Sequence, residues 1–289
     1  MSETKLLDYN DTSIVSQSML KVFIDSPENY RNRYVLRITP QDKQTDAMLL
    51  GSMVHCLFLE KENFSMDFHV IQLPDRRGNA WKAEVETAFE YGKVPVLEKD
   101  YKTALAMSDK LESNPYVQQI FEDHAELNWN GATVVEQELF WDGPHFKKKG
   151  RPDMILTRNL NGERFATILE LKTTASPNLD EFKRAYYSNG YHIQAAWYEE
   201  GLKANAGEDV QVDHKVIAIR NKEPFDVAVY RIIPSPDRGE DIGMIDLGKR
   251  AIAKYETLLA ESLKTDDWTL NSLQGGKEGD FILPERWML

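Results

Sequence analysis

Residues 151–174 read RPDMILTRNLNGERFATILELKTT, a pattern that predicts two β-strands joined by a tight turn. The pair Asn161-Gly162 is the strongest short hairpin signal, because a type I′ turn needs positive φ at both central residues. With this pair at the turn, Asp153 on the first strand lies opposite Glu170 on the second. Directly opposed residues of an antiparallel pair point to one face, with Cβ atoms about 5 Å apart. The turn therefore predicts two carboxylates side by side.

The two faces of this hairpin differ in chemistry. Lys172 follows Glu170 by two residues and therefore shares its face. The opposite face carries apolar residues and suits burial against helices: Met154, Leu156, Leu169 and Leu171. The run ATILEL is too apolar for a solvated edge strand, so we expect the carboxylates to face a cleft.

Paired carboxylates beside an ammonium suit metal-assisted phosphodiester cleavage. Two like charges at this distance repel each other, and each raises the pKa of the other. A divalent cation between them stabilises the array, and the Lys172 ammonium can orient a water or a phosphate. The alternative interpretation is a surface hairpin with an exposed Glu-Lys pair, which would add little stability.

Composition excludes several classes of protein. The 289 residues suffice for one large domain or two modest ones, and the single cysteine, Cys56, excludes disulfide frameworks, Cys-ligated zinc and four-cysteine iron–sulfur clusters. No apolar run approaches the roughly 20 residues of a membrane span and no signal peptide opens the chain, so we expect a cytoplasmic protein with no membrane partner. The net charge of −12 argues against a wholly basic surface but allows a narrow basic channel.

The order of predicted helices and strands is typical of an α/β (α+β) protein, and we expect a single domain over 1–289. We expect a helical N-terminal part at about 13–125, a catalytic sheet with helices at about 130–235, and a C-terminal helix and tail at 240–289. Helices are predicted at 17–25, 27–35, 47–60, 80–91, 98–112, 116–122, 179–189, 191–204 and 240–263. Besides the hairpin, strands are predicted at 68–73, 134–141, 214–220 and 226–233.

Two acids and one histidine are ambiguous by pattern alone. His55 follows Gly51 by four residues in an apolar helix, where a histidine is more often a core residue than a ligand. Gly51 itself costs helix stability, so we expect close packing there. Glu136 and Glu138 alternate onto one face of the strand at 134–141, so either could support a site on the hairpin.

Two basic stretches are candidate DNA contacts. Arg76 and Arg77 stand beside a glycine and could clamp a phosphate, because the arginine fork matches phosphate oxygens; the alternative is a solvated loop. Most short lysine runs are solvated turns. The run of Lys147, Lys148 and Lys149, however, leads through Arg151 to the proposed metal site, where a polyanion backbone would pass.

Taken together, the motifs resemble those of the PD-(D/E)xK nuclease superfamily, in particular the RecE-type (exonuclease VIII) branch of phage recombination exonucleases. They occur in the family's order from about Ser16 to the closing Pro-x-x-Trp. The set comprises Gly-x-x-x-His at 51–55, Glu136, Lys-Gly-Arg-Pro-Asp at 149–153, Glu-Leu-Lys-Thr-Thr at 170–174, and Tyr-His-x-Gln overlapping Gln-x-x-x-Tyr at 191–198.

The resemblance implies a PD-(D/E)xK restriction-endonuclease-like core, a mixed central β-sheet flanked by helices. It implies 5′–3′ digestion of double-stranded DNA from linear ends with Mg²⁺, for which Mn²⁺ can substitute. Relatives form homo-oligomeric rings and work beside a single-strand annealing protein of the RecT kind. Alternatives are a RecB-like nuclease that cuts internally or acts on single strands or flaps, and a DNA-end-binding protein that does not cleave.

The resemblance also implies a role for each motif residue. Four residues would bind metal: His55, Asp153, Glu170 and, through its carbonyl, Leu171. Glu136 would ligate or support a second ion, and Lys172 would orient the attacking water and stabilise the developing charge. Gln194 and Tyr198, one helical turn apart, would position the DNA strand; by spacing alone the pair indicates helix packing.

Overall fold

The predicted hairpin lies at the centre of the protein. In the computed structural model, which describes residues 8–40, 44–126, 132–234 and 242–269, β7 (Met154–Leu160) pairs antiparallel with β8 (Glu163–Thr174). Arg158 faces Phe165 and Leu160 faces Glu163, which confirms the predicted register. Asn161 and Gly162 have φ of 52° and 86°, as the type I′ turn requires.

This hairpin belongs to a mixed sheet that has five strands within the described residues, in the order β10-β9-β8-β7-β4. β8 runs parallel to β9, and the other neighbouring pairs are antiparallel. The remaining strands are β4 (Thr133–Val135), β9 (Gln211–Arg220) and β10 (Val227–Ile232).

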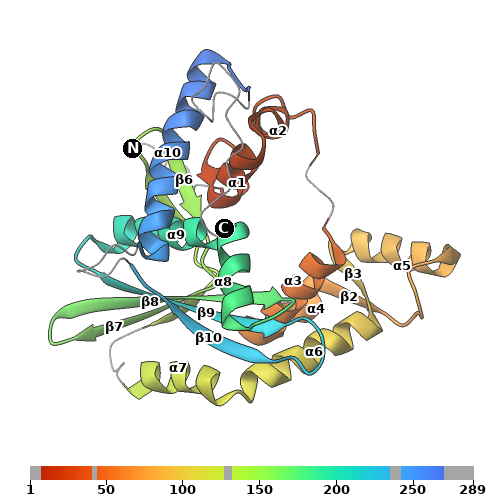
Figure 1. Cartoon of the computed structure of the whole chain (residues 1–289). Coiled ribbons are helices and arrows are strands. Elements are labelled where there is room, and N and C mark those ends of the chain that lie inside the picture. Colours follow the sequence, from red (N-terminus) through yellow and green to blue (C-terminus); the bar gives the residue numbers. More distant parts are fainter. Residues whose placement is uncertain (1–7, 41–43, 127–131, 235–241, 270–289) are drawn as a thin grey trace, which may run out of the picture.

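Helices cover both faces of the central sheet (Figure 1). One face buries Met154, Leu156, Leu169 and Leu171 against α3 (Asp46–Leu59), α6 (Glu98–Glu112) and α7 (Pro115–Glu126). The other face buries Ile155 and Ile168 against Trp197 of α9 (Tyr191–Ala206), and α8 (Leu179–Ser188) covers β9. This is the predicted α/β class, a mixed sheet between helical layers. None of the described helices combines the length and apolar character that crossing a bilayer requires.

Two smaller sheets flank the central one. β1 (Val15–Ser16), β6 (Lys147–Gly150) and β5 (Leu139–Asp142) pack with α1 (Gln17–Asp25) and α10 (Met244–Thr265). The other pair is parallel, β2 (Phe68–Ile71) with β3 (Val94–Leu97), and β3 was not predicted because Pro95 interrupts its short apolar run. The other elements are α2 (Pro27–Tyr30), the π-helix Arg31–Val35, the 3-10 helix Lys61–Asn63, α4 (Phe64–Asp67) and α5 (Gly78–Glu90).

Local signals position α3 over the end of the hairpin. Thr45 caps the helix by accepting a hydrogen bond from the Met48 amide at 3.2 Å. A Cβ at Gly51 would lie 3.2 Å from the hydroxyl of Thr173 on β8. Close packing is therefore the reason for this glycine, as predicted, and it brings His55 of the next turn over the hairpin.

The predicted strand at 134–141 is wrong as one element. β4 ends at Val135 and pairs in the central sheet, whereas β5 begins at Leu139 and pairs in the small sheet. Glu136 between them has φ of 52°, a left-handed conformation that turns the chain out of the first sheet. The predicted tail after 269, with its Pro-x-x-Trp motif, lies outside the described residues.

Candidate active site

Three candidate metal ligands meet at the open end of the hairpin. His55 comes from α3, Glu136 from the junction after β4, and Asp153 from the residue before β7. One ligand atom of each lies within 4.8 Å of the others. The Nε2 atom of His55 is 3.1 Å from Oε1 of Glu136 and 3.3 Å from Oδ1 of Asp153.

The backbone of the hairpin holds the two acids in place. The amide of Leu171 donates to Oδ2 of Asp153 at 2.7 Å, and the amide of Asp153 donates to Oε1 of Glu170 at 3.1 Å. The Glu136 amide donates to the Asp153 carbonyl at 3.1 Å. The Asp153–Glu170 pairing expected from the turn therefore forms through backbone bonds, and each acid is bound to the opposite strand.

Glu170 lies beside the ligand cluster rather than within it. Its second oxygen accepts a hydrogen bond from Nζ of Lys172 at 2.8 Å, and the side chain is buried. The Lys172 ammonium also lies 5.0 Å from the ring centroid of Tyr191, a contact that the motif alone did not predict. Tyr191 precedes Gln194 by three residues, so helical spacing could have indicated it. The roles of Glu170 and Glu136 as metal ligands therefore stay predictions, and the structure places Glu136 nearer to His55.

Burial and mutual repulsion shift the protonation of the site. Burial raises the pKa of Glu170 to about 7, and the Asp153 charge adds to this while Lys172 opposes it. Burial also raises the pKa of Asp153, but Lys172 and His55 outweigh it and hold that pKa below its ordinary value. Burial lowers the pKa of His55, yet Asp153 and Glu136 raise it overall. A cation bound among these acids would relieve the repulsion between them.

The residues fit a divalent cation. Nε2 of His55 is buried and has no hydrogen-bond partner, although two carboxylate oxygens lie close to it. The imidazole nitrogen and the two carboxylate oxygens thus converge within ion-pair distance of one another. Two carboxylates and one imidazole form a donor set that accepts Mg²⁺ or Mn²⁺. His55, Glu136 and Asp153 would hold such an ion.

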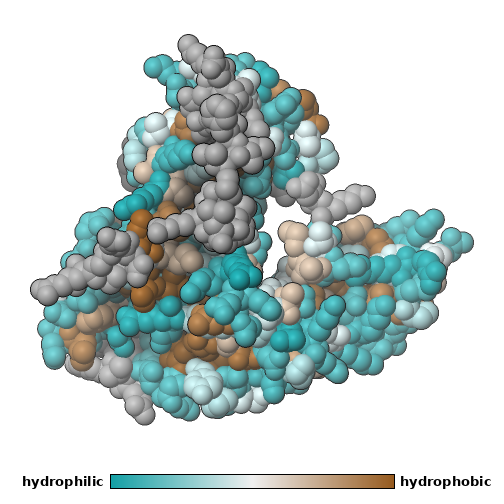
Figure 2. Space-filling view, viewed as in Figure 1, coloured by the Kyte–Doolittle hydropathy of each residue, from teal (hydrophilic) through white to brown (hydrophobic). Residues whose placement is uncertain are grey.

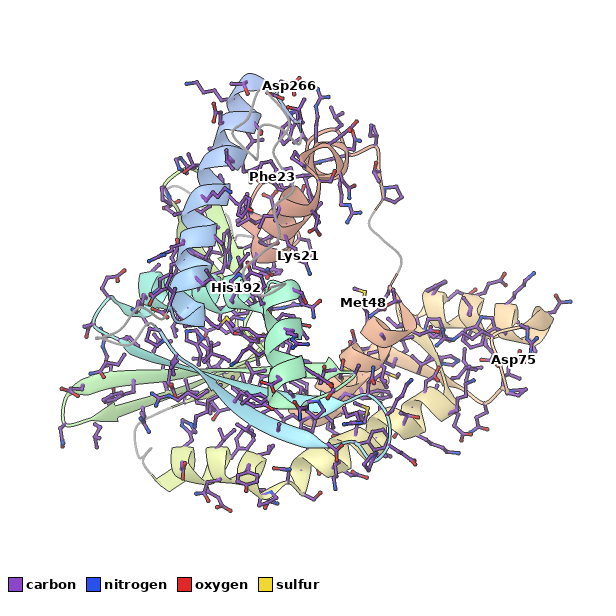
Figure 3. All side chains as sticks on the ribbon, in the orientation of Figure 1. Lys21, Phe23, Met48, Asp75, His192 and Asp266 are labelled. Carbon is purple, nitrogen blue, oxygen red and sulfur yellow. The ribbon has the colours of Figure 1, made fainter. Side chains whose placement is uncertain are left out.

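The site opens into a large pocket. The cavity measures about 1050 Å³ and is lined by His55, Asp153, Lys172 and Gln194, among others. Leu171 also lines it, as does Met48 at the first turn of α3. Figure 2 shows the molecule hollowed between α8 and this end of α3, where Figure 3 labels Met48.

Gln194 and Tyr198 have different positions relative to this pocket. The Gln194 amide lines it and donates to the Tyr198 hydroxyl at 3.0 Å. Tyr198 is buried and does not line the pocket. Gln194 therefore reaches the pocket, whereas Tyr198 holds the Gln194 amide from behind.

Two of the three lysines predicted to contact DNA are buried, and that prediction is wrong for them. Lys148 has no exposed surface; its Nζ donates to Glu200 and Glu256 and lies 4.0 Å from the Trp197 ring centroid. The Nζ of Lys149 donates at 2.6 Å to two carbonyls of the N-terminal segment, at Tyr9 and Asp11. The physical reason is that the run forms β6, the middle strand of its sheet, and not a turn.

The other two basic residues of this stretch remain at the surface. Lys147 is exposed and pairs with Asp142 at 2.8 Å. Arg151 lies at the pocket, with its Nε 2.6 Å from Oε2 of Glu136 and its guanidinium 5.0 Å from the Tyr9 ring centroid. Glu138 is exposed, so of the two acids only Glu136 lies at the candidate metal site.

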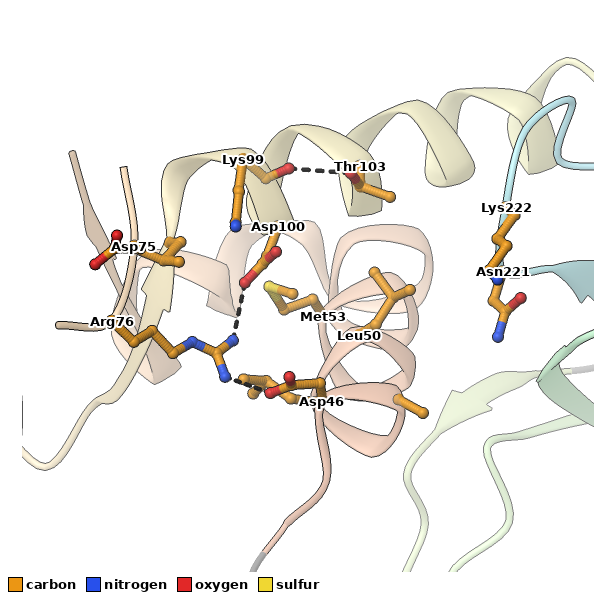
Figure 4. Close-up of a pocket in the computed structure, with 13 residues that line it drawn as sticks. Asp46, Leu50, Met53, Asp75, Arg76, Lys99, Asp100, Thr103, Asn221 and Lys222 are labelled. Carbon is orange, nitrogen blue, oxygen red and sulfur yellow. Dashed lines mark hydrogen bonds and ion pairs between the residues drawn. The ribbon is translucent and has the colours of Figure 1, made fainter. Parts of the chain in front are cut away.

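The arginine pair after β2 does not form the predicted clamp. Figure 4 shows the Arg76 guanidinium between Asp46 and Asp100, with the second contact at 2.8 Å. These residues line a separate cavity of about 380 Å³. Arg77 pairs with Asp75 of its own loop at 2.7 Å. Arg76 is therefore held between two carboxylates, whereas the Arg77 side chain remains 86% exposed and pairs only with a neighbour in its own loop.

The fold and the site define a protein of the PD-(D/E)xK nuclease superfamily: a hairpin that carries Asp153 on one strand and Glu170 and Lys172 on the next, within a mixed sheet flanked by helices. More narrowly, the chain belongs to the family described as PDDEXK-like domain of unknown function (DUF3799), whose model matches residues 16–267. The comparison with curated proteins found no match.

Two solved structures are similar to this chain, and the first of them shares its fold. One is the crystal structure of a candidate exonuclease from Eubacterium rectale, with 16% sequence identity and a TM-score of 0.51. The match covers 96% of this chain and 89% of that one. A second, SSO0001, is 17% identical over 73% of this chain and 86% of that one, but its TM-score of 0.28 is too low to support an argument.

Proposed function

We propose that this protein is a metal-dependent exonuclease of the RecE type. It digests double-stranded DNA from linear ends in the 5′–3′ direction and leaves 3′ single strands for phage or prophage recombination. The observation that carries the proposal is the convergence of His55, Glu136 and Asp153 beside Lys172, in a pocket open to a DNA strand. The structural likeness to a candidate exonuclease supports the same class of activity.

The chemistry follows from the side chains. Bound Mg²⁺, or Mn²⁺ in its place, would polarise a phosphoryl oxygen and lower the pKa of a bound water. Burial lowers the pKa of Lys172, but Glu170 and Asp153 outweigh it and hold that pKa above its ordinary value. Lys172 therefore stays charged, orients the water and stabilises negative charge on the phosphate. Glu170 holds the Lys172 ammonium in place through the hydrogen bond at 2.8 Å.

Cleavage of end-labelled linear duplex tests the proposal. Wild type with Mg²⁺ should release label, and EDTA should stop the release. Lys172→Ala should lose about 100-fold or more of the rate, the cost of removing one group that stabilises transition-state charge. Lys110→Ala, at an exposed position on α6, is the matched control and should cleave normally. If wild type and Lys172→Ala release label at equal rates with every divalent ion, the proposal is wrong.

Substrate topology separates the two related activities. An exonuclease leaves a closed circular duplex intact, whereas a RecB-like nuclease that cuts internally linearises it. Cleavage of a flap or of a single strand, with the blunt duplex left intact, would indicate a RecB-like nuclease that acts on those substrates. Tight binding to duplex ends without cleavage in Mg²⁺ or Mn²⁺ would instead indicate a DNA-end-binding protein.

The proposal extends to partners. We expect a single-strand annealing protein to take up the 3′ strand, and a ring of copies of this chain to hold the duplex. Co-purification with a RecT-like protein and the mass of the protein in solution test these two expectations separately.

A further inference from the structure

A second groove lies directly behind the active-site pocket. It is a cavity of about 390 Å³ between α1, α10 and the turn that joins α8 to α9. Within that turn, Asn189 and Tyr191 line the active-site pocket, while Ser188, Gly190 and His192 line the groove. The two sites therefore share one wall, five residues long. Figure 3 labels Lys21 and His192 on the groove side of this wall.

The groove is basic although the protein is acidic. Its lining includes Lys21, Arg250 and Lys254, and Asp25 is the one acid among the described residues that line it. Arg250 and Lys254 are exposed, and Lys21 donates to the Asn189 carbonyl at 3.0 Å. Within the described part of the chain, none of these three cations has a carboxylate partner. Other cations of the protein are paired with carboxylates, for example Arg164 with Asp209 and Arg231 with Asp213.

An aromatic platform stands in the same groove. The rings of Tyr187 and His192 are stacked, with centroids 4.8 Å apart and an interplanar angle of 15°. Tyr187 is 54% exposed, whereas His192 beneath it is 5% exposed and its Nδ1 has no hydrogen-bond partner. Burial lowers the pKa of His192, so the ring is neutral at pH 7 and supports Tyr187 without adding charge. The outer face of Tyr187 is thus held ready to stack.

We propose that this groove binds a single strand of DNA that continues from the active-site pocket across the turn at residues 188–192. Lys21, Arg250 and Lys254 contact its phosphates, and one base stacks on Tyr187. An exposed aromatic face recognises an unpaired base, and unpaired cations follow the backbone, which is the general design of single-strand grooves. This inference rests on the proposed function for the identity of the polymer.

Fluorescence anisotropy in EDTA measures binding without cleavage. The probes are a blunt duplex and the same duplex with a 3′ or a 5′ tail of about ten nucleotides, within the site size of known single-strand grooves. The triple variant Lys21→Ala/Arg250→Ala/Lys254→Ala should lose roughly tenfold or more of its affinity for one tailed probe. Its slope of log K against log salt should fall by about 2, since each phosphate contact to a single strand contributes about 0.7.

The matched control is Lys82→Ala/Lys110→Ala/Lys264→Ala, which removes the same charge from exposed positions on α5, α6 and α10. Tyr187→Ala should weaken binding of the tailed probe about fivefold or more, and Tyr116→Ala, an exposed tyrosine on α7, should not. If both groove variants bind the tailed probes as their controls do, the proposal is overturned.

Cleavage of the blunt duplex separates this inference from the proposed function. Groove variants should still cleave the blunt duplex with Mg²⁺, which also shows that they fold. If the wild type cleaves the blunt duplex and the groove variants bind the tailed probes normally, the groove proposal is refuted and the nuclease proposal stands. If the wild type cleaves no substrate but the groove variants lose affinity for the tailed probes, the nuclease proposal is refuted and the groove proposal stands.

Discussion

Glu136 shows how one side chain connects the ligand cluster to its surroundings. Its Oε1 lies toward His55 at 3.1 Å, and its Oε2 is held by Arg151 at 2.6 Å. Arg151 in turn rests on the ring of Tyr9, whose segment is bound to β6 through Lys149. Arg151 is thus a positioning residue that holds a candidate ligand in the orientation that faces the cluster.

Arg151→Gln should bind Mn²⁺ about tenfold or more weakly. Loss of a positive charge alone would favour the cation, but loss of a partner that orients a ligand typically costs 10–100-fold in affinity and should dominate. Titration followed by electron paramagnetic resonance measures the change. Arg158→Gln, which removes the same charge from a residue packed on Phe165, is the control. Equal or tighter Mn²⁺ binding by Arg151→Gln would mean that Arg151 competes with the ion.

Glu170 should make the metal-free protein less stable as pH rises. Its pKa is raised to about 7 in the folded protein from 4.5, so folding favours its protonated form. The stability that this group adds is fully present below its pKa in the unfolded protein, and it is lost as pH rises through its folded pKa of about 7. Glu170→Gln should remove much of that loss, which urea unfolding in EDTA at pH 5 and pH 8 measures.

The control for this prediction is Glu138→Gln, which changes an exposed acid. The pKa of His55 is also raised, so its contribution is likewise lost as pH rises, and only the difference between wild type and Glu170→Gln reports on Glu170. If Glu170→Gln and wild type lose stability in parallel, the carboxyl group is not protonated in the folded protein.

At the scale of elements, the crossing of α9 and α10 forms one side of the groove that we propose for single-stranded DNA. Gly248 of α10 lies against the first turn of α9, where a Cβ would stand 2.1 Å from the His192 carbonyl oxygen. Backbone atoms cannot yield as a side chain can, so this crossing requires glycine. The same crossing carries His192, which supports the aromatic platform in the groove.

Gly248→Ala should lower the free energy of unfolding by about 1–3 kcal/mol, the usual cost of overpacking, despite the better helix propensity of alanine. Urea denaturation measures the loss. Glu261→Ala, at an exposed position of the same helix, should change stability by less than about 0.5 kcal/mol. A Gly248→Ala protein as stable as wild type would show that the helices can separate without penalty.

At the scale of the whole molecule, a buried ion network joins the small sheet to the helices behind the active site. Lys148 of β6 contacts Glu200 of α9 and Glu256 of α10, and it lies between Trp141 and Trp197. Burial raises the pKa of Glu256, and the Lys148 charge opposes that shift. The network stabilises the arrangement of three elements distant in sequence.

Lys148→Met should lower the free energy of unfolding by about 3–5 kcal/mol, because it leaves the Glu256 carboxylate buried without a cation. Lys148→Met/Glu256→Leu should recover much of that loss, since no buried charge remains. Lys147→Ala, the exposed neighbour, should be nearly neutral. Thermal unfolding with matched chemical denaturation measures all three. A neutral Lys148→Met variant would show that water reaches Glu256.

The sequence by itself determined the local geometry of the hairpin turn and of the helix at 98–112. Asn161-Gly162 specified the turn and hence the register that places Asp153 beside Glu170, because turn chemistry depends on adjacent residues alone. The helix at 98–112 agrees with α6 at both ends, because apolar spacing depends on the period of the helix. The motif order likewise indicated the superfamily.

Tertiary structure alone decided which groups meet and which are buried. The turn at Glu136 directs that acid toward the site and leaves Glu138 exposed. Because β6 is the middle strand of its sheet, Lys148 and Lys149 are buried. The pairing of Arg76 with two distant aspartates removed the expected clamp. Partners far apart in sequence are set by how elements cross, and a one-dimensional pattern does not contain that geometry.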